Sequence, residues 1–466
     1  MARVEVRGLQ SPVWRVTLEL LALALEPARA PIRGDVRSLS RKTTMFDHSR
    51  RAVRFTLFVA TALAVACSSP LAVAESPDQH WITTWSTANA EVPSPSAFNN
   101  QTIREIVHTT VGGGAVRIRL ANSFNAQPVT FDAVYLGLQK SGASLVPSSN
   151  HKVTFGGNNS ITIREGAEAL SDAISLTVGP EQNLVVSLYA SGATGPATVH
   201  SIAFQTNYVS DTGNFAADDQ SSAFTRTMQS WYFLHSVDVV ASPEVKGAIA
   251  ALGDSITDGV SSRPDLYERW TDVLARRLLS SGSNHGMSVL NAGIAGNRVL
   301  TSSPCWGVNA LARLDRDVFS QTGVQAVILF EGTNDIGQPD TPTASLSPQV
   351  IPCLSRTQIS ADDLIAGYKQ IIAQAHARGL KIFGATILPY QGFGGWTQQG
   401  EAKRVAVNNW IKTSGSFDGI IDFAAVLSDP ANSARMHPKY DSGDHLHPGP
   451  AGHEAMGNAI DLALFR

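Results

Sequence analysis

The chain has 466 residues, a formal net charge of −3 and a charged fraction of 16%. This length is large for one domain and gives two domains enough residues to bury a core each. The near-neutral composition has no basic footprint, so it argues against nucleic acid as a partner. It suits an exported protein whose partners are neutral molecules.

Residues 45–74 have the order of regions that is typical of a secretory signal. Three arginines between positions 50 and 54 precede an apolar stretch at 55–66, and Ala72-Val73-Ala74 offers small residues for cleavage. The apolar stretch is too short to predict a membrane span. We therefore expect a secreted or periplasmic protein without a stable membrane span after cleavage.

Residues 1–44 are interpreted as an upstream or disordered extension, which makes Met45 a candidate start. A competing interpretation makes Cys67 a lipid-attachment cysteine of a lipoprotein. In the usual pattern the leucine lies closer to the cysteine than Leu63 does here, so plain secretion is favoured.

Residues 75–243 are expected to form an all-β sandwich, similar to a jelly roll. Short apolar runs with period two alternate with Gly, Asn and Ser, and no stretch has the length and period of a helix. The runs at 103–110 and 116–120 flank three glycines and predict a hairpin in which Arg117 and Arg119 face outward. Further strands are expected at 129–138, 160–163, 184–189, 199–208 and 231–240.

Three tryptophans of this region, Trp81, Trp85 and Trp231, have two interpretations. They could stack on sugar rings, or they could be core and interdomain aromatics, as the burial preference of tryptophan favours. Only five residues, 241–245, join the two predicted domains. Such a joint is too short for a flexible tether, so we expect the domains to pack rigidly.

Residues 244–466 are expected to form an α/β domain. Strand-like runs alternate with helical patterns, which predicts a parallel sheet with helices on both faces and ligands at the carboxyl ends of the strands. The strands are expected at 248–252, 288–291, 326–330, 382–387 and 419–422, and the helices at 267–280, 308–319, 362–377, 401–412 and 451–464.

Chemistry is expected from four polar motifs, at residues 253–259, 291–298, 332–335 and 444–448. The first three begin where a predicted strand ends, so they should meet at one edge of the sheet. A serine hydroxyl becomes a nucleophile when a base takes its proton and a carboxylate orients that base. Ser255 in the first motif, with Asp444 and His447 in the last, provides these three groups.

In this order, the four motifs resemble those of the SGNH/GDSL hydrolase family, whose Ser, Gly, Asn and His fall on Ser255, Gly296, Asn334 and His447. The resemblance covers the chain from about residue 245 onward and implies a flavodoxin-like sheet. It also implies acyl transfer through an acyl-enzyme, with His447 as the base and Asp444 orienting it. The backbone amides of Ser255 and Gly296 and the side chain of Asn334 would form the oxyanion hole. Such a mechanism needs no metal and no organic cofactor.

Other polar residues of the motifs have less direct expectations. Asp254 is expected to bond local backbone, and Asp258 and Asp335 to cap turns. His445 is the second candidate for the base. Arg298 is a candidate substrate contact, with an ion-pair partner as the alternative.

The cysteines that follow the signal are Cys305 and Cys353, each preceded by a proline. In an oxidising compartment they are expected to form a disulfide, with two free thiols as the alternative. A zinc site is disfavoured because histidines at ligand spacing are missing beside them.

Three functions follow from these motifs. The first is a secreted esterase that hydrolyses short acyl esters, including acetyl groups on a carbohydrate, as in some two-domain acetyl esterases of similar architecture. The second is an acyltransferase that passes the same acyl group to a sugar or alcohol. The third is a carbohydrate-binding protein of the cell envelope.

Overall fold

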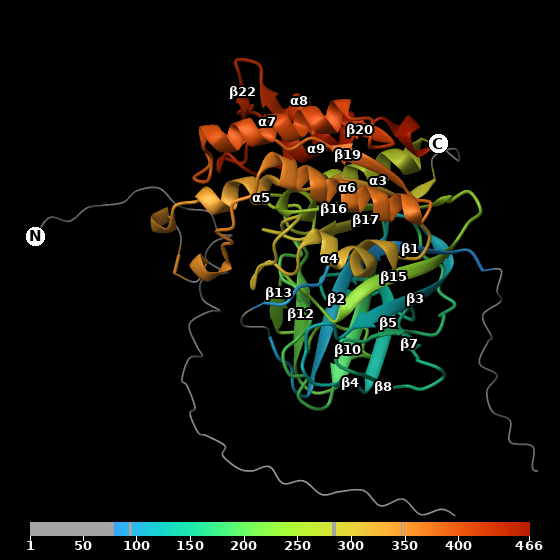
Figure 1. Ribbon diagram of the computed structural model, residues 1–466. Helices are drawn as coiled ribbons and strands as arrows, with labels where there is room; N and C mark the ends of the chain where they lie inside the picture. Colours follow the sequence, from blue (N-terminus) through green and yellow to red (C-terminus); the bar gives the residue numbers. More distant parts are fainter. Residues whose placement is uncertain (1–78, 93–95, 282–285, 346, 349) are drawn as a thin grey trace, which may run out of the picture.

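The computed structural model describes residues 79–92, 96–281, 286–345, 347–348 and 350–466. It contains a strand-rich unit and, beside it, a helix-rich unit formed by the second half of the chain (Figure 1). The predicted signal at 45–74, the extension at 1–44 and Cys67 lie outside the described residues.

The strand-rich unit is built from two antiparallel sheets. One has the order β1 (Trp81–Ser86), β15 (Leu234–Ala241), β3 (Gly113–Ala121) and β9 (Glu168–Leu170). The other has the order β13 (Arg226–Met228), β12 (Asn207–Thr212), β2 (Gln101–His108), β10 (Asn183–Ala190), β5 (Ala133–Ser141) and β6 (Ser144–Leu145), with β7 (His151–Val153) paired to β5. Two small ladders join β4 (Val129–Phe131) to β8 (Ile161–Ile163) and β11 (Val199–His200) to β14 (Trp231–Tyr232).

The two sheets pack face to face and share one apolar core. Ile118 and Leu120 of β3 lie in the same buried cluster as Val186 and Leu188 of β10. Successive side chains of a strand point to opposite faces, so the alternation in the sequence fills this core from both sheets. The predicted β-sandwich is confirmed.

The predicted hairpin around the three glycines is wrong. Strand β2 pairs with β10 and β12, whereas β3 pairs with β15 and β9, so residues 109–112 cross from one sheet to the other. Gly112 is needed in this crossing because a Cβ there would lie 2.5 Å from the Val178 carbonyl oxygen. The local pattern gives the faces of both strands but says nothing about which strands pair.

The side chain of Arg117 points away from the sandwich core, as expected, but it is buried rather than exposed to solvent. Its Nε lies 3.0 Å from Asp238 Oδ2. The same carboxylate accepts a hydrogen bond from Thr322 Oγ1 of the second unit, at 2.9 Å. The outer face of this sheet is therefore covered by the α/β unit. Arg119 is half-buried and pairs with Glu168 at 3.2 Å.

The helix-rich unit is the predicted α/β domain. Its sheet has the order β17 (Met287–Gly293), β16 (Gly247–Gly253), β18 (Val324–Phe330), β19 (Lys381–Ala385) and β20 (Gly419–Ile421). All four strand pairs are parallel, and this order is that of flavodoxin-like sheets. A small ladder pairs β21 (Ser428–Asp429) with β22 (Asn432–Met436).

Helices cover both faces of this sheet. The α-helices are α2 (Ser255–Asp258), α3 (Trp270–Ser280), α4 (Ala310–Leu314), α5 (Thr333–Gly337), α6 (Ala361–Ala377), α7 (Gln398–Thr413), α8 (Phe423–Leu427) and α9 (Pro450–Ala459). Helix α4 continues as a π-helical turn at Asp315–Phe319, and short 3-10 turns lie at Gln338–Asp340, Thr343–Ser345, Ile351–Cys353 and Leu462–Phe465. Leu252 and Leu329 pack with α4, α6 and α7, whereas Ala251 and Ile328 pack with α3, α8 and α9. Among the described helices, none is long and apolar enough to cross a membrane.

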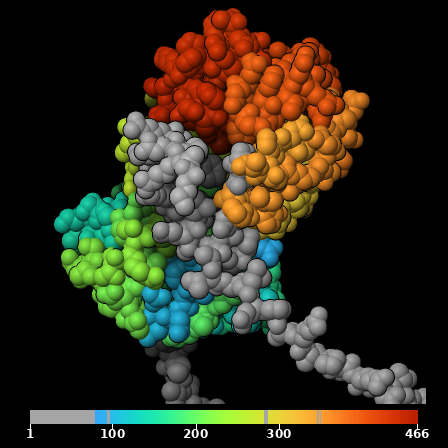
Figure 2. Space-filling model, turned by 90° about the vertical axis from the view of Figure 1, so that its left-hand side faces the viewer, coloured from blue at the N-terminus to red at the C-terminus, as the bar shows by residue number. Residues whose placement is uncertain are grey.

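The two units are packed directly against each other, with the red and orange surface of the α/β unit above the green and blue sandwich (Figure 2). Ala248 and Leu290 of the parallel sheet belong to the apolar core cluster of the sandwich. Ser288 Oγ donates to the Thr83 carbonyl at 2.7 Å, and the Thr322 amide donates to Thr83 Oγ1 at 2.8 Å. Apolar and polar contacts thus fix the orientation of one unit on the other.

We expect the two units to unfold as one cooperative transition, because separating them would expose a shared apolar core. Differential scanning calorimetry should give one peak whose calorimetric and van't Hoff enthalpies agree. Two resolved peaks, or unfolding of the sandwich at a temperature where the α/β unit stays native, would contradict this coupling.

Candidate active site

Ser255 lies at the carboxyl end of the central strand β16, at the first position of α2. Its turn requires a glycine before it, because a Cβ on Gly253 would lie 2.1 Å from Thr257 Oγ1. Asp254 caps the helix by accepting a hydrogen bond from the Ile256 amide at 3.0 Å, as expected from the sequence. The hydroxyl of Ser255 is thereby placed at the edge of the sheet formed by the carboxyl ends of the strands.

Asp444 and His447 meet Ser255 from the loop before α9. His447 Nε2 lies 2.9 Å from Ser255 Oγ, and His447 Nδ1 lies 2.6 Å from Asp444 Oδ2. The other oxygen of Asp444 accepts the amides of His447 at 2.8 Å and Leu446 at 2.9 Å. Burial opposes ionisation of Asp444, but hydrogen bonds and the charge of His447 hold its pKa well below the usual range. The chain from hydroxyl to imidazole to carboxylate suits proton transfer from the serine.

His445, the second candidate for the base, does not meet the serine. It adopts a positive φ of 65°, and its side chain is 53% exposed. Its Nδ1 lies 2.7 Å from Asp441 Oδ2. The same loop therefore carries two histidine–carboxylate pairs, and one of them touches Ser255.

Gly296 lies in the loop after β17 and Asn334 lies in the first turn of α5, and hydrogen bonds join the two segments. Asn334 Nδ2 donates to the Asn297 carbonyl at 3.0 Å, and Gln338 Nε2 donates to the Gly296 carbonyl at 2.7 Å. The backbone amides of Ser255 and Gly296 have no acceptor among the described residues. These two amides and the second amide hydrogen of Asn334 are therefore available to a developing oxyanion.

Gly296 needs to be a glycine for two reasons. Its φ is +79°, and a Cβ at this position would lie 2.3 Å from the ring of Trp306. Trp306 thus covers the backbone of the glycine. The Asn297 side chain holds this arrangement by donating to the Trp306 carbonyl at 2.8 Å.

Arg298 is fully buried and bonds to protein groups. Its Nε lies 3.8 Å from Asp335 Oδ1, and it donates to the carbonyls of Ser355 at 3.2 Å and Thr357 at 3.0 Å. This burial favours the ion-pair alternative over a substrate contact. Asp335 also accepts the Val299 amide at 2.9 Å, so it caps the neighbouring motif rather than its own turn.

Arg313 is an important residue that the motifs did not indicate. Its buried guanidinium donates to the carbonyls of Gly253 at 2.9 Å and Ala292 at 2.7 Å and to Asn297 Oδ1 at 2.9 Å. It therefore binds the ends of two strands and the loop that carries Gly296. In the sequence its signal is an arginine inside an otherwise apolar helical turn, residues 310–314.

Several carboxyl groups near Arg313 and Arg298 are buried. Burial raises the pKa values of Asp254 and Asp335 to about 6 and that of Glu331 well above its usual range. Arg313 lies 3.5 Å from Glu331 and 3.3 Å from Asp317. Within the described residues, no cluster of His, Cys, Asp and Glu could hold a metal ion.

The predicted disulfide between Cys305 and Cys353 is present, with 5.2 Å between the Cα atoms. Ser303 Oγ reinforces it by donating to the Cys353 carbonyl at 2.7 Å and accepting the Cys305 amide at 3.2 Å. The bridge joins the loop after Gly296 to the segment after α5, the helix of Asn334. It also anchors Trp306, the next residue after Cys305.

The three tryptophans make contacts within the protein. Trp85 and Trp231 are buried and pack edge to face with centroids 5.0 Å apart. Arg117 lies over the ring of Trp81 at 4.3 Å. These contacts fit the core and interdomain interpretation better than stacking on a sugar.

Comparison with known proteins gives a family match for the second half of the chain. Residues 251–455 match the model of the GDSL-like Lipase/Acylhydrolase family. A comparison with curated proteins gave no match.

Several solved structures are similar to the α/β unit. An M. smegmatis aryl esterase is 18% identical, with 46% of this chain and 95% of that chain covered and a TM-score of 0.35. An acetylxylan esterase from Geobacillus stearothermophilus is 20% identical, with 46% and 91% covered and a TM-score of 0.33. A GDSL-like lipase from Bacteroides thetaiotaomicron is 17% identical, with 47% and 88% covered and a TM-score of 0.34.

The two histidine pairs of one loop give a matched test of the base. We expect His447→Gln to lower kcat by about 10⁴-fold or more, since the proton of Ser255 would lose its acceptor. His445→Gln, in the same loop, should stay within about threefold of the wild type because its ring bonds Asp441. Ester hydrolysis measured on both purified variants decides; equal losses would leave the base unassigned.

The disulfide should contribute to both stability and turnover. It closes a loop with a sequence separation of 48, for which chain entropy gives about 4 kcal/mol of stabilisation. A Cys305→Ser/Cys353→Ser variant should melt at a lower temperature and lose more kcat than KM, because Trp306 and Gly296 lose an anchor. An unchanged melting temperature, or two alkylatable thiols in the exported protein, would contradict this role.

Proposed function

Residues 251–455 belong to the GDSL-like lipase/acylhydrolase family, and on that premise we propose that this hydrolase is a serine carboxylic-ester hydrolase. The observation that carries the proposal is the continuous chain of hydrogen bonds from Ser255 through His447 to Asp444. Esters suit such a site because their cleavage needs a nucleophile, a base and donors for an oxyanion, which are the roles that we propose for these residues.

In the first half of the reaction Ser255 Oγ attacks the ester carbonyl carbon while His447 Nε2 takes its proton. Asp444 holds the imidazole in the correct tautomer and stabilises its cation. The carbonyl oxygen becomes an oxyanion that accepts hydrogen bonds from the amides of Ser255 and Gly296 and from Asn334. The carbon–oxygen bond to the alcohol then breaks, and His447 returns its proton to the leaving oxygen.

In the second half a water molecule attacks the acyl-enzyme. His447 takes a proton from the water, the same donors hold the new oxyanion, and the carboxylic acid leaves as Ser255 recovers its proton. An alcohol or sugar hydroxyl in place of water would give acyl transfer through identical steps. The same nucleophile therefore serves whether water or a hydroxyl group accepts the acyl group.

We propose that the preferred esters carry short acyl groups, including acetyl groups on a carbohydrate. Trp306 lies directly on Gly296 and is anchored through Cys305, so the wall beside one oxyanion donor is bulky and tethered. A neutral, weakly charged chain also suits an uncharged substrate. We propose further that the protein is exported, a location in which the Cys305–Cys353 bridge would persist.

We propose a domain boundary near residues 243 and 244. Strand β15 of the sandwich ends at Ala241, and the first strand of the parallel sheet begins at Gly247. The boundary separates the antiparallel strands from the unit that supplies all of the proposed catalytic groups.

Ser255→Ala should lower ester hydrolysis by about 10⁴- to 10⁶-fold, as expected for removal of a triad nucleophile. The assay uses p-nitrophenyl esters of increasing chain length together with acetylated oligosaccharides, and short chains should be preferred. Ser280→Ala, on the exposed side of α3, is the matched control. A folded Ser255→Ala protein with more than a few per cent of wild-type activity would refute the proposal. Transfer of the acyl group to an added sugar in preference to water would identify an acyltransferase.

A further inference from the structure

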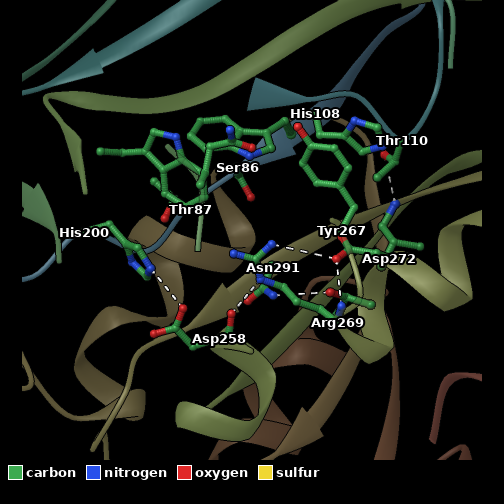
Figure 3. Close-up of a pocket in the computed structure, with 15 residues that line it drawn as sticks. Ser86, Thr87, His108, Thr110, His200, Asp258, Tyr267, Arg269, Asp272 and Asn291 are labelled. Atoms are coloured by element: carbon green, nitrogen blue, oxygen red, sulfur yellow. Dashed lines mark hydrogen bonds and ion pairs between the residues drawn. The ribbon is translucent and has the colours of Figure 1, made fainter. Parts of the chain in front are cut away.

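The sandwich unit reaches into the first motif of the α/β unit through His200. Figure 3 shows His200 facing Asp258 on the wall of a cavity between the two units. His200 Nε2 lies 3.1 Å from Asp258 Oδ1, and both side chains are buried. Asp258 is three residues after Ser255, in the same short helix.

The other oxygen of Asp258 holds the loop that carries Gly296. Oδ2 accepts a hydrogen bond from the Ala295 amide at 3.0 Å. On the other side of Gly296, its carbonyl accepts Gln338 Nε2 at 2.7 Å. The Gly296 amide lies between these two fixed groups, so they set the direction of its N–H bond.

His200 is itself held rigidly by the sandwich. Its Nδ1 lies 2.8 Å from the Ala88 carbonyl, and strand β11 pairs with β14 on one side. The Ala90 amide donates to the Val199 carbonyl at 2.8 Å on the other. A carbonyl and an ionised carboxylate can only accept hydrogen bonds, so this geometry suits a His200 ring that is protonated at both nitrogens.

The charges around this ring agree with its geometry. Burial lowers the pKa of His200, but the charge and hydrogen bond of Asp258 outweigh burial and raise it overall. Arg269 opposes this rise, and its Nε donates to the Asp258 carbonyl at 2.7 Å. His108, Tyr267 and Asp272 are the other titratable groups on the wall of the cavity.

We propose that His200 of the sandwich is a positioning residue for the oxyanion hole. His200 acts through the Asp258 carboxylate on the Ala295–Gly296 backbone. The inference rests on the proposed esterase function. A glycine has few intrinsic limits on its backbone, so a donor on glycine depends on its neighbours for direction. Preorganised donors stabilise the transition state more than the bound ester, so misplacement should affect kcat rather than KM.

The test compares two buried histidines of the same interface. His235 is also fully buried, but its Nε2 lies 3.1 Å from the Arg316 carbonyl, away from the Gly296 loop. We expect His200→Gln to lower kcat about 10- to 100-fold with KM within about threefold. His235→Gln should keep kcat within about threefold. Titration of active sites with a fluorophosphonate gives kcat per folded site, so loss of folded protein is not counted as loss of turnover.

A pH profile of the wild type gives a second measurement that needs no variant to fold. The pKa of His200 is raised in the folded protein. The stabilising interaction of protonated His200 with Asp258 is therefore fully present below the unfolded pKa of about 6.5 and is lost as pH rises through the folded pKa. We expect the wild-type kcat to fall as pH rises through the folded pKa of His200, with little change in KM. His200→Gln should lack that decline.

Two results would overturn the inference. One is a His200→Gln protein whose kcat per titrated site equals that of His235→Gln. The other is a wild-type kcat that stays constant on the alkaline side until the protein unfolds. The activity of Ser255→Ala separates the positioning role of His200 from the proposed esterase function. If that variant is inactive while His200→Gln is normal, the positioning role fails and the esterase proposal stands.

Discussion

The buried guanidinium of Arg313 is the interaction on which the geometry of the site depends. Where the strands of a parallel sheet end, the ladder of backbone hydrogen bonds ends too, so the last carbonyl groups need other donors. Three of the motifs begin at those strand ends. Arg313 donates to the carbonyls of Gly253 and Ala292, at the ends of two strands, and to the side chain of Asn297. Removing it would take one donor from each of these three acceptors and one cation from the buried carboxyl groups of Glu331 and Asp317, and both losses destabilise.

The same network of ion pairs and hydrogen bonds continues into the sandwich, so it connects the two units. Asp317 pairs with Arg313 and also accepts Arg316 Nε at 2.6 Å. Arg316 donates in turn to the Asn89 carbonyl of the sandwich at 2.8 Å. Burial lowers the tendency of Asp317 to ionise, but these two guanidinium groups reverse this effect and lower its pKa. The π-helical turn after α4 brings Arg316 and Asp317 to this junction.

Local patterns predicted the parallel sheet, because buried parallel strands appear as continuous apolar runs. The motifs after those strands and near the C-terminus also gave the candidate residues Ser255, Asp444 and His447, which lie within hydrogen-bond distance of one another in sequence from hydroxyl to imidazole to carboxylate. The pairing of β2 and β3 was not predictable in this way, since period two is the same whichever strand lies alongside. His200 gave no signal because its partner, Asp258, lies 58 residues further along the chain. Arg313 was missed because an arginine in a helical pattern is ordinarily solvated, and Arg117 because the outer face of one sheet is covered by the second unit.

Ser255 and His447, the proposed nucleophile and base, are 192 residues apart in the chain. During synthesis the strand before Ser255, the segments of Gly296 and Asn334 and the whole sandwich therefore precede the segment that carries Asp444 and His447. A chain that stops before this segment lacks Asp444 and His447 and also α9, whose Met456 lies in the core of the α/β unit. The last part of the core and the group proposed to take the proton of Ser255 are therefore synthesised together.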